Sequence, residues 1–120
     1  MKKLVVLILC LLSINIVAQQ YQEINRTKIN LTDTILVKYI GRYALDTDYH
    51  KTYTIQLENG ILYATENDEE KIEITPDTET TFFDDPQSKD GYVFTLNAQT
   101  GKYNLTIILA DLKLTAKRLQ

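Results

Sequence analysis

The chain has 120 residues, with 13 Lys and Arg against 16 Asp and Glu, one His, one Cys and no Trp. This length suits a single domain and excludes a two-domain enzyme and a membrane protein with several spans. One Cys cannot pair within the chain, so a disulfide scaffold is excluded as well. The formal net charge of −3 and the lack of a basic block argue against a nucleic-acid-binding protein.

Residues 1–18 have the pattern of a secretory signal peptide. Two lysines follow Met1, Leu4 to Leu12 is an unbroken apolar run, and the polar Gln19 follows the small Ala18. The apolar run is shorter than the roughly 20 residues that a membrane-spanning helix needs. The pattern therefore predicts a leader that is cleaved between Ala18 and Gln19, and a periplasmic or secreted protein.

Cys10 leaves a second interpretation open, a lipoprotein in which this Cys becomes the lipidated first residue. Leu9 stands where a small residue is expected, and Cys10 lies inside the apolar run, so the cleaved signal is preferred. Residues 19–120 then contain no Cys and carry a formal charge of −5, from 11 Lys and Arg against 16 Asp and Glu. Such an exported domain must be held together by its apolar core alone.

Residues 19–30 are polar with scattered Ile and predict a flexible N-terminal arm, whereas residues 31–120 form one domain. The segment Thr32 to Tyr39 predicts a short helix with Thr32 as its N-cap. From residue 19 onward the chain has 15 Thr, 10 Ile and 8 Tyr, which favour strands. Alternating segments separated by turns predict eight strands that start near Gly41, Lys51, Ile61, Lys71, Thr80, Tyr92, Lys102 and Leu112.

Evenly spaced strands with short loops predict an antiparallel, up-and-down arrangement. An open sheet of eight strands would expose two edges and one apolar face, so we expect the sheet to close into a barrel. The side chains expected inside are mostly large, which predicts a filled core. They are Tyr43, Leu45, Tyr53, Ile55, Leu57, Leu62, Ile72, Ile74, Phe83, Phe94, Leu96, Leu105, Ile107, Leu109 and Leu114, with Ala64 and Ala116 as the main small ones.

A barrel places its first and last strands side by side, which brings Gly41 and Tyr43 near Arg118. A guanidinium over an aromatic ring is attracted by roughly 0.5–1 kcal/mol or more. We therefore expect Gly41, Tyr43 and Arg118 to seal the closure of the barrel, which is a structural role.

Five ordered segments between about Leu36 and Leu119 resemble one known domain. They are Tyr39–Tyr43 (YIGRY), Leu57–Tyr63 (LENGILY), Phe82–Phe83, Tyr92–Leu96 (YVFTL) and Ala116–Arg118 (AKR). On these motifs the chain resembles a domain of unknown function at the C-terminus of many serine hydrolases of the beta-lactamase and penicillin-binding-protein type. The resemblance implies a lipocalin-like eight-stranded barrel. A bacterial origin is expected from the pattern of the N-terminal segment, residues 1–18.

The nucleophile motif of those hydrolases, Ser-x-x-Lys, is missing from residues 19–120. Their one serine, Ser88, is followed by Lys-Asp-Gly. The resemblance therefore implies a stand-alone accessory or binding module, with a serine hydrolase or another envelope protein or peptide as its partner.

Other candidate residues have simpler interpretations. His50 is the sole His and reads as a loop residue, because no Cys and only the loop residue Ser88 are available as a nucleophile after residue 18. Asp84, Asp85 and Asp90 share a loop, but their spacing does not match a calcium-binding EF-hand loop. We predict no catalytic residue, no metal site and no cofactor.

The leading hypothesis is a non-catalytic exported β-barrel that recognises a protein, a peptide or a cell-envelope component through its rim or outer face. The alternative is a lipocalin-like carrier of a small apolar ligand, which would need an open cavity that the bulky inward residues leave little room for. A small hydrolase would need a nucleophile and a base within hydrogen-bonding distance, and the residue inventory argues against it.

Overall fold

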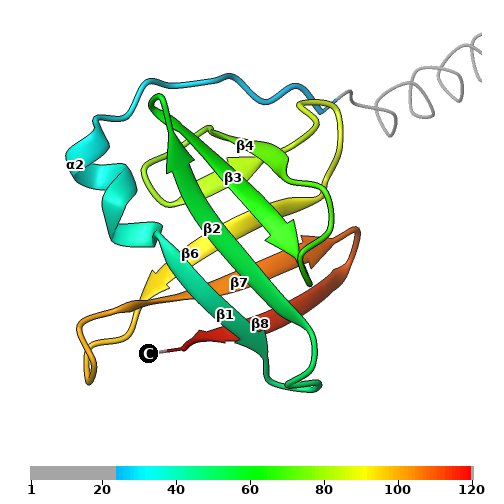
Figure 1. The fold of residues 1–120 in the computed structure, drawn as a ribbon. Coiled ribbons are helices and arrows are strands. Elements are labelled where there is room, and N and C mark those ends of the chain that lie inside the picture. The colour runs from blue at the N-terminus through cyan, green and yellow to red at the C-terminus, as the bar shows by residue number, and fades with distance from the viewer. Residues whose placement is uncertain (1–23, 120) are drawn as a thin grey trace, which may run out of the picture.

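The structure, a computed structural model, describes residues 24–119 and shows a closed barrel of eight antiparallel strands (Figure 1). Each strand pairs with the next, and β8 returns to pair with β1. The elements are α2 (Asp33–Leu36), the 3-10 helix η1 (Val37–Tyr39), β1 (Gly41–Leu45), β2 (Thr52–Glu58), β3 (Ile61–Glu66), β4 (Ile72–Pro76), β5 (Thr81–Phe83), β6 (Gly91–Leu96), β7 (Tyr103–Leu109) and β8 (Leu112–Arg118). The predicted all-β barrel with one short N-terminal helix is confirmed. The expected signal peptide, its cleavage site at Ala18 and Gln19, and Cys10 lie outside the described residues.

Alternation and turn residues fix the strands where the sequence predicted them, with every start within one residue of its predicted position. In β2 and β3 the directly opposed residues Ile55 and Ala64 are both buried. Between these strands Asn59 and Gly60 have φ of 52° and 80°, as a tight hairpin turn requires.

The interior is packed with large apolar side chains. The most deeply buried are Tyr39, Tyr43, Phe82, Phe94, Ile55, Leu62, Ile74 and Leu105. Among residues 24–119 no polar or charged residue is buried, and no buried side-chain nitrogen or oxygen lacks a hydrogen-bonding partner. The barrel is therefore filled, as predicted.

One residue expected to point inward does not, and three others that do are less buried than expected. Phe82 belongs to the core cluster, whereas Phe83 is buried outside it, because neighbouring residues of a strand point to opposite faces. The three residues of β5 are too few for a period of two to be read from the sequence. Ile72, Leu96 and Leu109 lie at strand ends and are about half exposed, at 48%, 53% and 45%.

Helices α2 and η1 cover one end of the barrel (Figure 1). Leu36 and Tyr39 are buried there, and the Tyr39 ring stacks on Phe94 with a centroid distance of 4.3 Å. The Tyr39 hydroxyl donates to the Glu79 carbonyl at 2.7 Å. Thr32 occupies the N-cap position but makes no side-chain capping hydrogen bond. We call the end of the barrel that α2 and η1 cover the covered end.

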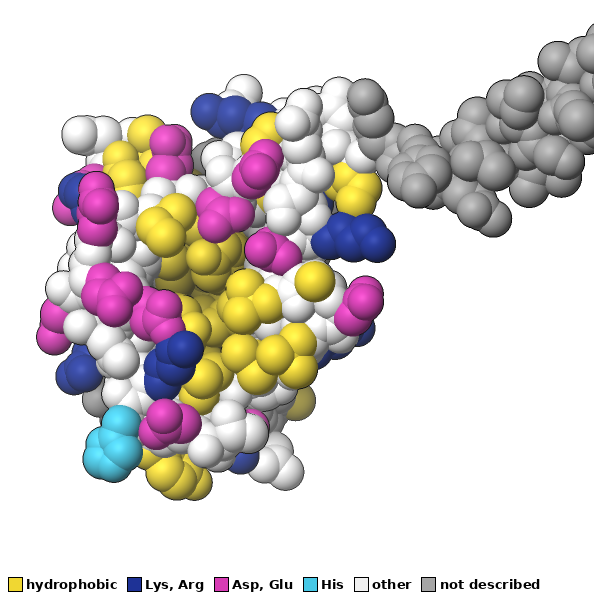
Figure 2. Space-filling model, turned by 90° about the vertical axis from the view of Figure 1, so that its right-hand side faces the viewer, with side chains coloured by type: hydrophobic (Ala, Val, Ile, Leu, Met, Phe, Trp, Pro, Cys, Tyr) yellow, Lys and Arg dark blue, Asp and Glu magenta, His cyan; other side chains and the backbone are white. Residues whose placement is uncertain are grey.

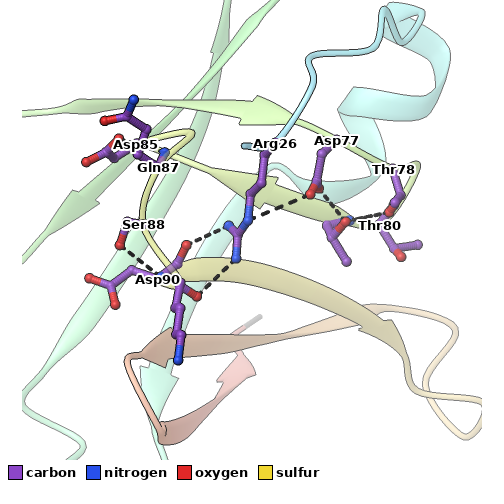
Figure 3. Close-up of polar contacts among 10 residues, drawn as sticks. Arg26, Asp77, Thr78, Thr80, Asp85, Gln87, Ser88 and Asp90 are labelled. Carbon is purple, nitrogen blue, oxygen red and sulfur yellow. Dashed lines mark hydrogen bonds and ion pairs between the residues drawn. The ribbon is translucent and has the colours of Figure 1, made fainter. Parts of the chain in front are cut away.

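Residues 24–30 are held against the barrel, in contrast to the loose arm expected for residues 19–30. The Arg26 guanidinium donates to the Asp90 carbonyl at 2.6 Å and to the Lys89 carbonyl at 3.0 Å, and it lies 4.0 Å from an Asp77 carboxylate oxygen (Figure 3). The Arg26 backbone N–H donates to the Pro86 carbonyl at 2.9 Å. The arm therefore ties the β5–β6 loop to the β4–β5 turn.

Candidate functional site

The two ends of the barrel differ. In an up-and-down barrel alternate loops lie at the same end. The β1–β2, β3–β4, β5–β6 and β7–β8 loops therefore gather at the end opposite to α2 and η1 (Figure 1). We call this the open end.

No helix of residues 24–119 is long and apolar enough to cross a membrane.

Three exposed apolar side chains extend the inner face of the barrel to the edge of the open end. Ile72 lies two residues before the buried Ile74, and Leu109 lies two residues after the buried Ile107. Leu112 is 55% exposed and lies directly opposite Leu109. Directly opposed residues and residues two apart share a face. We call Ile72, Leu109 and Leu112 the apolar rim.

Acidic loops surround the apolar rim. Ten of the sixteen acidic residues lie in or next to the four loops of the open end: Asp46, Asp48, Glu66, Asp68, Glu69, Glu70, Asp84, Asp85, Asp90 and Asp111. Three lysines, Lys51, Lys71 and Lys89, lie in the same loops. Seen from the side on which these loops gather, Figure 2 shows an apolar hollow bordered by acidic side chains. This end therefore combines exposed apolar surface with negative charge.

Polar groups line one side of the same end. Lys51 forms an ion pair with Glu66 at 2.8 Å, and the Tyr53 hydroxyl donates to Glu66 at 3.3 Å. Tyr92 lies directly opposite the core residues Phe82 and Ile107, so its ring enters the barrel. Burial, and then the negative charge of Asp84, raises the pKa of Tyr92 to about 12. Tyr92 therefore stays protonated and can donate a hydrogen bond across the physiological pH range.

The sequence candidates His50 and Ser88 lie in two different loops of the open end, β1–β2 and β5–β6. The His50 backbone N–H donates to the Asp48 carboxylate, and the Ser88 hydroxyl accepts from the Asp90 N–H. No hydrogen bond joins the side chains of His50 and Ser88 within the described chain.

The acidic loop of β5–β6 is used structurally. Asp85 accepts from the Gln87 N–H at 3.0 Å, and Asp90 accepts from the Ala110 N–H at 2.7 Å. Among residues 24–119 no group of three or more His, Cys, Asp or Glu side chains could hold a metal ion.

Gly41, Tyr43 and Arg118 lie together near the covered end. Arg118 is directly opposite Tyr43 in the β1–β8 pair, and its guanidinium carbon lies 5.6 Å from the centre of the Tyr43 ring. Gly41 has φ of +153°, and a Cβ there would lie 2.5 Å from that carbon. The guanidinium occupies the space that only a glycine leaves free.

No protein-family model matches the chain, and neither does any curated protein or solved structure. The resemblance to the C-terminal domain of serine hydrolases stays a prediction.

Sequence reasoning placed Ile72 and Leu109 inside the barrel and did not recognise the apolar rim. The available signal was their position, since each stands within two residues of an acidic turn. An apolar residue at the last inward position of a strand is buried only if something covers that end of the barrel.

Proposed function

We propose that the protein is a non-catalytic binding module, and that its open end holds a peptide segment that carries both apolar and positively charged side chains. The observation that supports this most is the apolar rim within a border of acidic loops. Exposed apolar surface rimmed by polar residues is typical of interaction sites. The excess of carboxylates selects a cationic occupant by charge complementarity.

The apolar rim supplies affinity. Ile72, Leu109 and Leu112 are each about half exposed, so an occupant can remove a large part of their surface from water. Fully burying one Leu or Ile side chain is worth roughly 1.5–3 kcal/mol. The acidic loops add attraction that weakens with salt, because they are exposed.

The filled interior favours a surface partner over the alternative, a carrier that encloses a small apolar ligand. Ile55, Leu62 and Leu105 close the centre of the barrel and are 0–1% exposed. Export by the predicted signal peptide would place the module among peptides and proteins of the cell envelope. That location is part of the proposal.

The test measures binding of two 12-residue peptides by calorimetry, one of alternating Leu and Lys and one of alternating Leu and Glu. We expect the Lys peptide to bind more tightly, and its affinity to fall as salt is raised. The double variant Leu109→Ser/Leu112→Ser should weaken it by about tenfold or more. Val37→Ser is the matched control, because Val37 is 49% exposed on η1 at the covered end.

Two results would count against this function. Equal affinity for both peptides would show that the acidic loops do not select a positively charged occupant. An equal loss of affinity in Val37→Ser and in the double variant would show that the apolar rim is not the site.

A further inference from the structure

A second, basic surface lies at the covered end, away from the peptide site. A hollow of about 420 Å³ is lined by Lys102, Asn104, Lys117 and Arg118 among others. A neighbouring hollow of about 400 Å³ shares Lys102 and Arg118 and adds Lys38, Leu96 and Tyr103. The β6–β7 loop, the end of β8 and η1 thus meet around one continuous surface. We call it the basic cleft.

The basic cleft is positive on an acidic protein. Lys38, Lys102, Lys117 and Arg118 line it, and neither hollow has an Asp or Glu in its lining. Within residues 24–119 the ion pairs are Arg26–Asp77, Lys51–Glu66 and Lys71–Glu58, and none of them involves the four cations. Like charges gathered on one surface repel one another, and a bound anion relieves that repulsion.

Arg118 is held in place before any ligand arrives. Its guanidinium lies over the Tyr43 ring and against the bare backbone of Gly41. Its backbone N–H donates to the Asn104 side-chain oxygen at 3.3 Å, so the Asn104 amide nitrogen is left as a donor. A fixed guanidinium loses less freedom on binding than a mobile one, and its planar fork matches the oxygens of phosphate.

We propose that the basic cleft binds an organic phosphate. The phosphate group lies among Lys102, Lys117 and Arg118, whose three cationic groups suit a doubly charged anion. The organic part lies over Leu96, which is 53% exposed, and beside Tyr103. The two hollows adjoin and are open to solvent, so the surface has room for an organic group beside the phosphate. A soluble phosphate ester and a phospholipid headgroup both supply this chemistry.

The first experiment titrates the ¹⁵N-labelled protein with phenyl phosphate, inorganic phosphate and sodium chloride at matched ionic strength. We expect phenyl phosphate to shift the amides of Lys102, Asn104 and Lys117 at the lowest concentration, inorganic phosphate to need more, and chloride to leave them unchanged. Lys102→Gln/Lys117→Gln should weaken phenyl phosphate binding by about tenfold or more. The matched control Lys113→Gln lies on the same strand at the open end, and it should stay within about twofold of the parent protein.

The second experiment separates the two sources of the phosphate. Flotation with phosphatidylcholine vesicles, with and without 30% phosphatidylglycerol, compares the double variant with Lys113→Gln. If the parent protein floats with the anionic vesicles and the double variant does not, the ligand is a lipid headgroup. Phenyl phosphate binding without such recovery assigns a soluble ester. Chloride shifts equal to those of phenyl phosphate, or unchanged binding in the double variant, would overturn the proposal. Failure at the open end would leave this result untouched, because the two tests use different residues and ligands.

Discussion

Substituting Gly41 by Ala tests how the barrel closes. Gly41 has φ of +153°, a backbone angle that residues with a Cβ rarely adopt. The Cβ of Ala would lie 2.5 Å from the guanidinium carbon of Arg118. The backbone conformation costs about 1–3 kcal/mol for a residue other than glycine. Pushing the guanidinium off the Tyr43 ring forfeits about another 0.5–1 kcal/mol. We therefore expect Gly41→Ala to lower the free energy of unfolding by about 1.5–4 kcal/mol.

Urea unfolding followed by circular dichroism measures this loss, and Gly101→Ala is its matched control. Gly101 also has a positive φ, of +73°, but a Cβ there meets nothing within 4 Å. The free energy of unfolding of Gly101→Ala should fall by about 1–2 kcal/mol, from backbone strain alone. Arg118→Ala adds a second comparison, because in that background Gly41→Ala should cost only the strain.

A double-mutant cycle between Gly41→Ala and Arg118→Ala should therefore give a coupling of about 0.5–1 kcal/mol, the part that the guanidinium contact contributes. Additive losses would refute the reasoning, because they would mean that the guanidinium does not occupy the space beside Gly41. So would a Gly41→Ala variant that is no less stable than Gly101→Ala.

Three further predictions use other contacts. Arg26→Ala should speed hydrogen exchange in the β5–β6 loop while strands β2 and β3 keep their protection, because Arg26 holds the Asp90 and Lys89 carbonyls; uniform exchange would contradict this. Tyr43→Phe removes the 2.7 Å hydrogen bond to the Tyr39 carbonyl and should cost about 1–2 kcal/mol by urea unfolding, and an unchanged midpoint would contradict it. Burial, as the largest cause, raises the pKa of both Tyr39 and Tyr92 to about 12, above the value near 10 of an unfolded chain. The stabilisation from these two neutral hydroxyls should be fully present below pH 10. It should fall by roughly 1–2 kcal/mol per group as the pH rises through 12, because both hydroxyls are only partly buried, and Tyr92→Phe should show a smaller fall.

Local patterns were sufficient to predict the strands. Asn59-Gly60 marks a tight turn because both residues accept positive φ, and the alternation around Tyr53, Ile55 and Leu57 follows directly from a period of two. Barrel closure followed from the number of strands. The proximity of Tyr43 and Arg118 required only that the first and last strands be neighbours.

The surfaces proposed to bind ligands could not be predicted in this way. The basic cleft takes its cations from Lys38, Lys102 and Lys117–Arg118, which are far apart in sequence and form no basic block. Similarly, the contacts of Arg26 reach more than sixty residues along the chain. Such juxtapositions depend on the register of every strand between the residues, which no local pattern encodes.

The unequal sharing of charge between the two ends gives the barrel an electric dipole along its axis. Carboxylates crowd one pole, and Lys38, Lys102, Lys117 and Arg118 stand near the other. Within a Debye length of an anionic surface, about 8 Å at physiological salt, a barrel with this charge distribution turns its positive end toward that surface. It would then stand upright with its apolar opening directed away from that surface, free to meet whatever approaches from solution.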